Sequence, residues 1–98
     1  MNECITYNEL ATLLGVYPML YWTDSANAIR EGDRIVDVKP TAMLRNYMSY
    51  SRDCRDRKVE NIIVHSFDGW HIPTREWLSD YTSMPIARYC DDGKEKGL

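Results

Sequence analysis

Histidines and nearby acidic residues are the side chains of this sequence that could carry out acid–base chemistry. His65 and His71 are the only histidines in the chain. Glu76 and Asp80 follow His71 closely enough to offer it a carboxylate partner. No glycine-rich phosphate loop, nucleophile elbow or metalloprotease helix accompanies them. We therefore expect a protein that is not an enzyme and that has no catalytic residue.

Thiol and imidazole groups could also form a zinc site. The candidate ligands are Cys54, His65, His71 and Cys90. Their spacing lacks the closely spaced cysteine pair of structural zinc sites. We expect neither a metal nor a cofactor, and a zinc-stabilised adaptor stays a third alternative. Three cysteines at irregular spacing also form no disulfide framework, so we expect free thiols in a reducing compartment.

Length and composition predict one small domain. The 98 residues are 44% hydrophobic and 11% aromatic, with a net charge of −3. Such a chain can bury a core, and it contains no apolar run of the ~20 residues that a membrane span requires. No secretory signal is visible at the N-terminus. We expect a cytoplasmic protein without membrane contact, with one globular domain over residues 1–90 and a flexible tail over 91–98.

A helix start is the clearest local signal. Thr6-Tyr7-Asn8-Glu9 is a capping box, and Ile5 and Leu10 occupy the positions of a hydrophobic staple. The leucines that follow give a short buried face, and Gly15 is expected as a left-handed C-terminal cap. A second helix has two possible starts, Pro18 at its first position or a cap at Thr23. In either case we expect a helix through Asp24–Glu31, ended by Gly32.

The rest of the chain alternates between strand and helix signals. We expect a strand at Arg34–Lys39 and then the longest helix, from Pro40 or Thr41 to about Arg57. Arg52–Asp56 and Asp53–Arg57 would be ion pairs on that helix. A β-hairpin is predicted from Glu60–Phe67, an Asp68-Gly69 type I′ turn and the return Trp70–Ile72.

A last short helix should open with Pro73 and Thr74 and be broken by Met84-Pro85, with three residues facing inward: Trp77, Leu78 and Tyr81. The predicted fold class is α+β, a small helix-dominated single domain with a short antiparallel β-hairpin.

Residues 6–31 resemble the helix-turn-helix of Cro-like repressors and excisionases. The resemblance is carried by Glu9-Leu10-Ala11, Leu14-Gly15-Val16 and Trp22. It implies a recognition helix whose first residues touch bases in the major groove. Four residues would then lie at the groove: Tyr17, Pro18, Met19 and Tyr21. A DNA-binding regulator is accordingly one function that the sequence offers.

The charge distribution favours a protein over DNA as the partner. Residues 1–44 contain six acidic and three basic residues, a balance of −3, and no base precedes Arg30. Binding to DNA depends largely on Lys and Arg neutralising phosphates, and this footprint is missing. Nucleic acid is therefore only the second choice of partner.

Tyrosine, tryptophan and methionine are abundant, at seven, three and five residues against a single Phe. These types are enriched at the centres of protein interfaces. We expect the partner-binding residues to be Tyr17, Met19, Tyr21, Tyr50, Arg52, Arg55 and Trp70. The leading hypothesis is a non-enzymatic modulator or inhibitor of a larger protein complex, similar in type to the small accessory proteins that phages direct against host nucleases, defence complexes or transcription. Its oligomeric state is left open.

Overall fold

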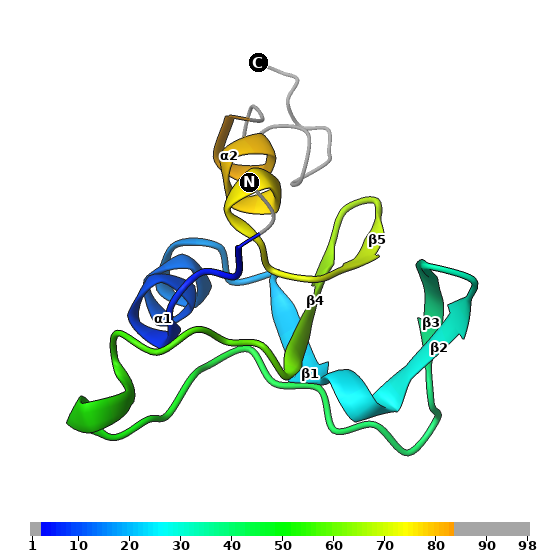
Figure 1. Ribbon diagram of the computed structural model, residues 1–98, viewed down its shortest axis with the longest axis horizontal. Coiled ribbons are helices and arrows are strands. Elements are labelled where there is room, and N and C mark those ends of the chain that lie inside the picture. The colour runs from blue at the N-terminus through cyan, green and yellow to red at the C-terminus, as the bar shows by residue number, and fades with distance from the viewer. Residues whose placement is uncertain (1–2, 84–98) are drawn as a thin grey trace.

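The computed structural model describes residues 3–83, which combine two α-helices with five strands (Figure 1). In chain order the elements are α1 (Tyr7–Val16), β1 (Tyr21–Asp24), the 3-10 turn η1 (Ser25–Asn27), β2 (Ala28–Glu31), β3 (Arg34–Val38), the 3-10 turn η2 (Arg52–Cys54), β4 (Ile62–Ser66), β5 (Gly69–His71) and α2 (Arg75–Ser83). The α+β class is confirmed. The expectation that helices dominate is wrong, because two segments predicted to be helical are strands and irregular chain.

Helix α1 begins at the predicted capping box. The Thr6 amide donates to Glu9 Oε1 at 2.8 Å, and the Glu9 amide donates to Thr6 Oγ1 at 3.2 Å. Ile5 and Leu10 are both fully buried, as the staple predicts. Gly15 is not the C-terminal cap, since it lies inside the helix, which ends at Val16 with Tyr17 as its C-cap at φ −118° and ψ 87°.

A three-stranded antiparallel sheet has β4 at its centre, with β1 on one side and β5 on the other. Trp22, Val64 and Ile62 belong to the core cluster and share one face. Tyr21 lies opposite His65, and His65 lies opposite Trp70, so these three form a row on the other face. The sheet therefore has a core face and a face with an aromatic row.

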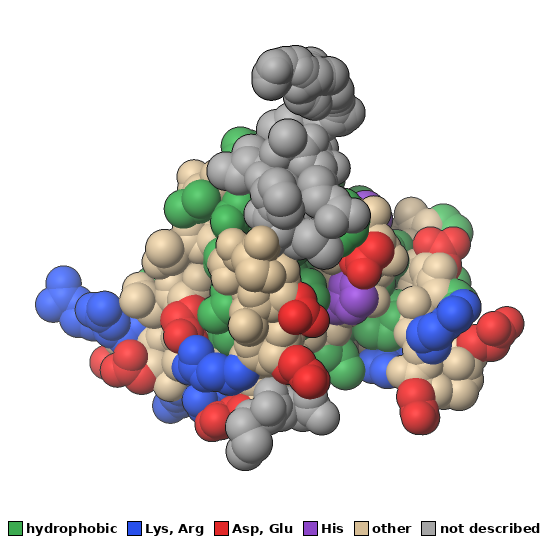
Figure 2. Space-filling model, turned by 90° about the horizontal axis from the view of Figure 1, so that it is seen from above, with side chains coloured by type: hydrophobic (Ala, Val, Ile, Leu, Met, Phe, Trp, Pro, Cys, Tyr) green, Lys and Arg blue, Asp and Glu red, His purple; other side chains and the backbone are tan. Residues whose placement is uncertain are grey.

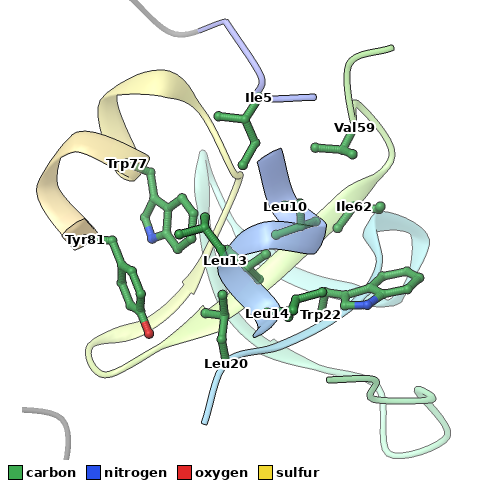
Figure 3. Close-up of a cluster of buried hydrophobic side chains, with 11 residues drawn as sticks. Ile5, Leu10, Leu13, Leu14, Leu20, Trp22, Val59, Ile62, Trp77 and Tyr81 are labelled. Atoms are coloured by element: carbon green, nitrogen blue, oxygen red, sulfur yellow. The ribbon is translucent and has the colours of Figure 1, made fainter. Parts of the chain in front are cut away.

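The core lies between α1, α2 and the sheet (Figure 3). Leu10, Leu13 and Leu14 of α1 are buried in it, and Trp77 and Tyr81 of α2 are stacked with their ring centroids 5.0 Å apart. Figure 3 shows the two α2 rings on one side of the α1 leucines and the sheet residue Trp22 at the far end of the cluster. The predicted inward residues of the last helix are confirmed, with Leu78 half-buried against the cluster.

Residues 24–31 do not form the predicted helix. They form the end of β1, η1 and β2, and β2 pairs with β3 in a separate two-stranded sheet. Gly32 has φ +63° at the turn of this hairpin, where a residue without a Cβ is favoured. Strand pairing outweighs the helical pattern here, because tertiary contacts override local propensity. Tyr21–Asp24 pairs with β4, and Ala28–Glu31 pairs with β3. The strand predicted at Arg34–Lys39 is confirmed as β3.

The long helix predicted from residue 40 to about 57 is also wrong. This segment is irregular apart from η2, and its backbone is bonded to other elements. The N–H and C=O of Arg45 pair with Trp22 of β1. The carbonyls of Arg55 and Arg57 accept from the first amides of α1, at Asn8 and Tyr7. These long-range bonds replace the helical ones.

The hairpin of β4 and β5 is confirmed, but its turn lies one residue earlier than predicted. Ser66 pairs with Gly69, so Phe67 and Asp68 are the two turn residues. Gly69 follows them with φ +121°, a conformation that side-chain-bearing residues rarely adopt. The predicted helix end at Met84-Pro85, the tail at 91–98 and Cys90 lie outside the described residues.

Candidate protein-binding cleft

A cleft of about 700 Å³ lies between the start of β3, the β4–β5 turn and α2. Its apolar lining includes Phe67, Trp70, Ile72 and Trp77. Phe67 and Ile72 are 45% and 42% exposed, whereas Trp77 is part of the core. A volume of this size is typical of sites that bind small molecules or short chain segments.

Acidic side chains surround the cleft. Four carboxylate residues line it from three different elements or turns: Asp33, Asp68, Glu76 and Asp80. Among residues 3–83, Arg34 is the only Lys or Arg in the lining. Figure 2 shows acidic side chains beside a histidine, facing the hairpin at the right of the view. All four carboxyl residues are exposed. The cleft therefore combines aromatic surface with a negative rim.

Ser66, Asp68 and His71 form a small polar cluster within this lining. Asp68 Oδ1 accepts from Ser66 Oγ at 3.0 Å and lies 2.7 Å from His71 Nε2. Partial burial opposes ionisation of Asp68, but the hydrogen bonds from His71 and Ser66 outweigh it and lower the pKa of this carboxyl. The predicted pairing of His71 with Glu76 or Asp80 is not formed. Because Ser66 donates to the carboxylate and not to the imidazole, the cluster is not arranged as a nucleophile with its base.

The candidate zinc ligands that the structure describes have separate partners. Cys54 Sγ accepts from Ser51 Oγ at 3.4 Å, and His65 packs edge-on against Trp70 with ring centroids 4.9 Å apart. His71 pairs with Asp68. Over residues 3–83, no three His, Cys, Asp or Glu side chains are grouped so that they could hold a metal ion.

The predicted binding residues fall into separate regions. Tyr17 packs edge-to-face on Tyr81 with ring centroids 4.9 Å apart, and Met19 is half-buried. Tyr21 is 41% exposed and belongs to the row with His65 and Trp70. Of the seven, only Trp70 lines the cleft.

Tyr50, Arg52 and Arg55 are brought together around η2, where they line a shallow depression of about 440 Å³. The Tyr50 hydroxyl donates to Asn8 Oδ1 at 2.8 Å, so this ring is held against α1. Basic side chains project from the left end of the molecule in Figure 2, over the η2 segment of Figure 1. The predicted pairs Arg52–Asp56 and Asp53–Arg57 are absent from the ion pairs formed within residues 3–83.

The acidic lining was missed by sequence reasoning. Asp33 and Asp68 each lie in a two-residue turn, and only the fold brings these turns to α2. One signal was available, because Glu76 and Asp80 are four residues apart and therefore share a helix face.

Comparison with known proteins adds no further information about the site. No protein-family model, curated protein or solved structure matches the chain. No helix within residues 3–83 is long and apolar enough to span a membrane. The function therefore has to be argued from the cleft and its surroundings.

Proposed function

We propose that the chain is a non-enzymatic protein-binding module that modulates a larger partner through the cleft beside β5. The observation that carries this proposal is the lining of the cleft, in which Trp70, Phe67 and Ile72 present partly exposed apolar surface inside an acidic rim. Aromatic anchors surrounded by polar groups are the usual composition of an interface centre and its rim.

The titratable groups of the cleft support binding over catalysis. His71 and Ser66 are both engaged with Asp68, which holds the β4–β5 turn together. A general base or nucleophile needs a partner arranged to exchange a proton with it and with a substrate. Here Ser66 and His71 both form hydrogen bonds to Asp68, so the three side chains are engaged with one another.

The class of partner follows from size and composition. A domain of 98 residues with a net charge of −3 and a surplus of Tyr and Trp resembles in type the small accessory proteins that phages encode. We propose that the partner is a subunit of a larger complex of this kind, such as a host nuclease, defence or transcription assembly.

Affinity capture with matched variants tests the proposal. Trp70→Ala removes the half-buried ring in the cleft, and Tyr47→Ala removes a ring that is 63% exposed and lies outside it. A protein captured by the wild type should then be purified and its affinity measured against both variants. Loss of an interface anchor costs about 2 kcal/mol or more, over tenfold in affinity.

The expected result is a stoichiometric partner whose affinity falls at least tenfold with Trp70→Ala and is unchanged with Tyr47→Ala. Thermal melts of both variants check that the fold is intact. Equal affinities for the wild type and a folded Trp70→Ala variant would contradict binding through the cleft.

A further inference from the structure

The space in the cleft suits a side chain and not an added strand. β3 lies alongside the outer side of β5, although the two strands belong to different sheets. An added strand would need that side of β5 for its main-chain hydrogen bonds. The cleft itself has a volume of about 700 Å³, within the range of sites that bind drug-sized ligands. It can therefore hold one large side chain of a partner together with the atoms beside it.

Aromatic rings form much of the apolar lining. Trp70 belongs to β5, Phe67 to the turn before it and Trp77 to α2. His65 packs against the half-buried Trp70 ring with an interplanar angle of 60° and ring centroids 4.9 Å apart, which supports the indole in its position. The face of an aromatic ring attracts a cation, and tryptophan does so most strongly. These rings therefore offer a cation both apolar contact and electrostatic attraction.

Three carboxylates lie beside these rings. Asp33, Glu76 and Asp80 are exposed, and none of them takes part in the ion pairs formed within residues 3–83. Glu76 and Asp80 are four residues apart on α2 and therefore share one face of the helix. Asp68 differs, since it is engaged with Ser66 and His71. The charge complementary to this lining is a cation that can also contact aromatic rings.

We propose that the cleft binds the guanidinium group of an arginine side chain of the partner protein. This inference rests on the proposed function and names the group that is recognised. A planar guanidinium stacks on the Trp70 ring while its N–H groups donate to Glu76 and Asp80. The methylene groups of the arginine pack on Phe67 and Ile72. A lysine ammonium carries the same charge but is more strongly hydrated and has no plane to stack.

The three tryptophans of the chain provide the readout for a first test. Trp70 and Trp77 line the cleft, whereas the Trp22 indole donates to the Tyr47 carbonyl at the other edge of the sheet. The full-length chain, labelled with ¹⁵N, is titrated with Nα-acetyl-arginine methylamide. The indole N–H resonance of Trp70, assigned with the Trp70→Phe variant, should shift and reach saturation while that of Trp22 stays in place. A Trp70 resonance that does not respond would overturn the proposal.

Matched ligands separate the contribution of charge from that of shape. Nα-acetyl-citrulline methylamide has a neutral urea group in place of the guanidinium and should leave the Trp70 resonance unchanged. Nα-acetyl-lysine methylamide keeps the charge without the plane and should bind more weakly than the arginine compound. An equal response to citrulline, or tighter binding of lysine, would contradict recognition of a guanidinium.

Charge variants locate the bound guanidinium through effects of opposite sign. Glu76→Gln/Asp80→Asn should raise the dissociation constant about tenfold, as expected for the loss of two exposed ion pairs. Arg34→Gln removes the only Lys or Arg that residues 3–83 contribute to the lining and should lower the dissociation constant about threefold. The control Asp53→Asn/Asp56→Asn neutralises two exposed carboxylates near η2 and should have no effect. Equal effects of the two double variants would contradict binding at the cleft.

Failure of this inference can be distinguished from failure of the proposed function, because the titration requires no partner. A captured partner that depends on Trp70 but binds the Glu76→Gln/Asp80→Asn variant with wild-type affinity leaves the proposed function in place and overturns this inference alone. A Trp70 resonance that responds to arginine, without any partner that depends on Trp70, supports the guanidinium site and overturns the proposed function.

Discussion

The two outer edges of the three-stranded sheet differ in their main-chain hydrogen bonding. The edge of β1 is closed by the chain itself, because both main-chain groups of Trp22 bond to Arg45. The Trp22 indole Nε1 also donates to the Tyr47 carbonyl at 2.6 Å, and the Arg45 guanidinium lies 5.3 Å from the indole ring centroid. The edge of β5 instead borders the cleft. One edge is thus closed by main-chain hydrogen bonds, while the other borders a cleft.

This difference matters because an open strand edge is a template for pairing with another chain. Covering β1 with residues 45–47 removes one such template. Within residues 3–83 no strand is hydrogen-bonded to the outer side of β5, although β3 lies alongside it, and the cleft with its acidic lining borders this side. The comparison predicts that substitutions at the closed edge affect stability, and that substitutions at the open edge affect binding.

The largest expected effect is that of Trp22→Ala. Trp22 is only 6% exposed, and its loss removes a large core side chain together with the bond to Tyr47. The free energy of unfolding should fall by about 3–5 kcal/mol. Chemical denaturation measures this, with Trp70→Ala as the control at the open edge. If Trp70→Ala were equally destabilising, the two edges would not differ in the way described.

Gly69→Val should have the next largest effect. Gly69 opens β5 with φ +121°, and an added Cβ would meet no atom within 4 Å, so the penalty is backbone strain alone. We expect a loss of about 1–3 kcal/mol. Gly15→Ala is the matched control, because Gly15 also has open space around it but lies inside α1. That substitution should stabilise the protein by about 0.5–1 kcal/mol. Equal melting temperatures for the wild type and Gly69→Val would show that the start of β5 does not require the positive φ of Gly69.

Features that depend on neighbouring residues could be predicted from the sequence. The capping box at Thr6 and Glu9 needs only residues three apart, and the hairpin of β4 and β5 needs a strand pattern followed by a turn signal. The β2–β3 hairpin has such a signal in Gly32-Asp33, but the residues before it also fit a helix, so Gly32 alone indicates a helix end.

Features that depend on distant residues could not be predicted. Residues 40–57 carry a helical pattern, but Arg45 bonds to Trp22, and Tyr50 bonds to Asn8 across 42 positions. The cleft is similar, since Trp70 was expected to bind a partner but its acidic surround is assembled from three segments. No pattern among neighbouring residues predicts that Asp33 lies near α2.

Acid should weaken the attachment of α2, which forms one wall of the cleft. Arg75, at the start of α2, donates to both carboxylate oxygens of Glu9 at 2.6 and 2.9 Å. These bonds, together with those from Thr6, outweigh partial burial and lower the pKa of Glu9. The stabilisation is complete above the pKa of an unfolded glutamate, about 4.3, and is lost as the pH falls through the lower folded value.

Glu9→Gln tests this attachment. It should cost about 1 kcal/mol at neutral pH, after allowance for the partial exposure of the pair. The difference between the wild type and the variant should shrink as the pH falls below about 4. Glu31→Gln is the control, since Glu31 lies exposed on β2 outside the ion pairs formed within residues 3–83. A difference that stayed constant with pH would show that the Glu9 charge is not what holds α2.

The smallest effect is expected for Arg45→Ala, and its size tells how the β1 edge is closed. The pairing with Trp22 uses the main chain of Arg45, which alanine retains. Alanine loses the contact of the guanidinium with the indole, about 0.5–1 kcal/mol, and the weak hydrogen bond that the guanidinium donates to Met43 Sδ at 3.1 Å. Arg45→Pro removes the N–H that donates to the Trp22 carbonyl and should cost more. It should also increase self-association at high concentration, because it frees part of the β1 edge. Light scattering and denaturation of the two variants measure both effects. If Arg45→Ala lowered the free energy of unfolding as much as Arg45→Pro, the side chain of Arg45 and not its main chain would close the β1 edge. The contrast between the hydrogen-bonded edge of β1 and the edge of β5 would then not hold.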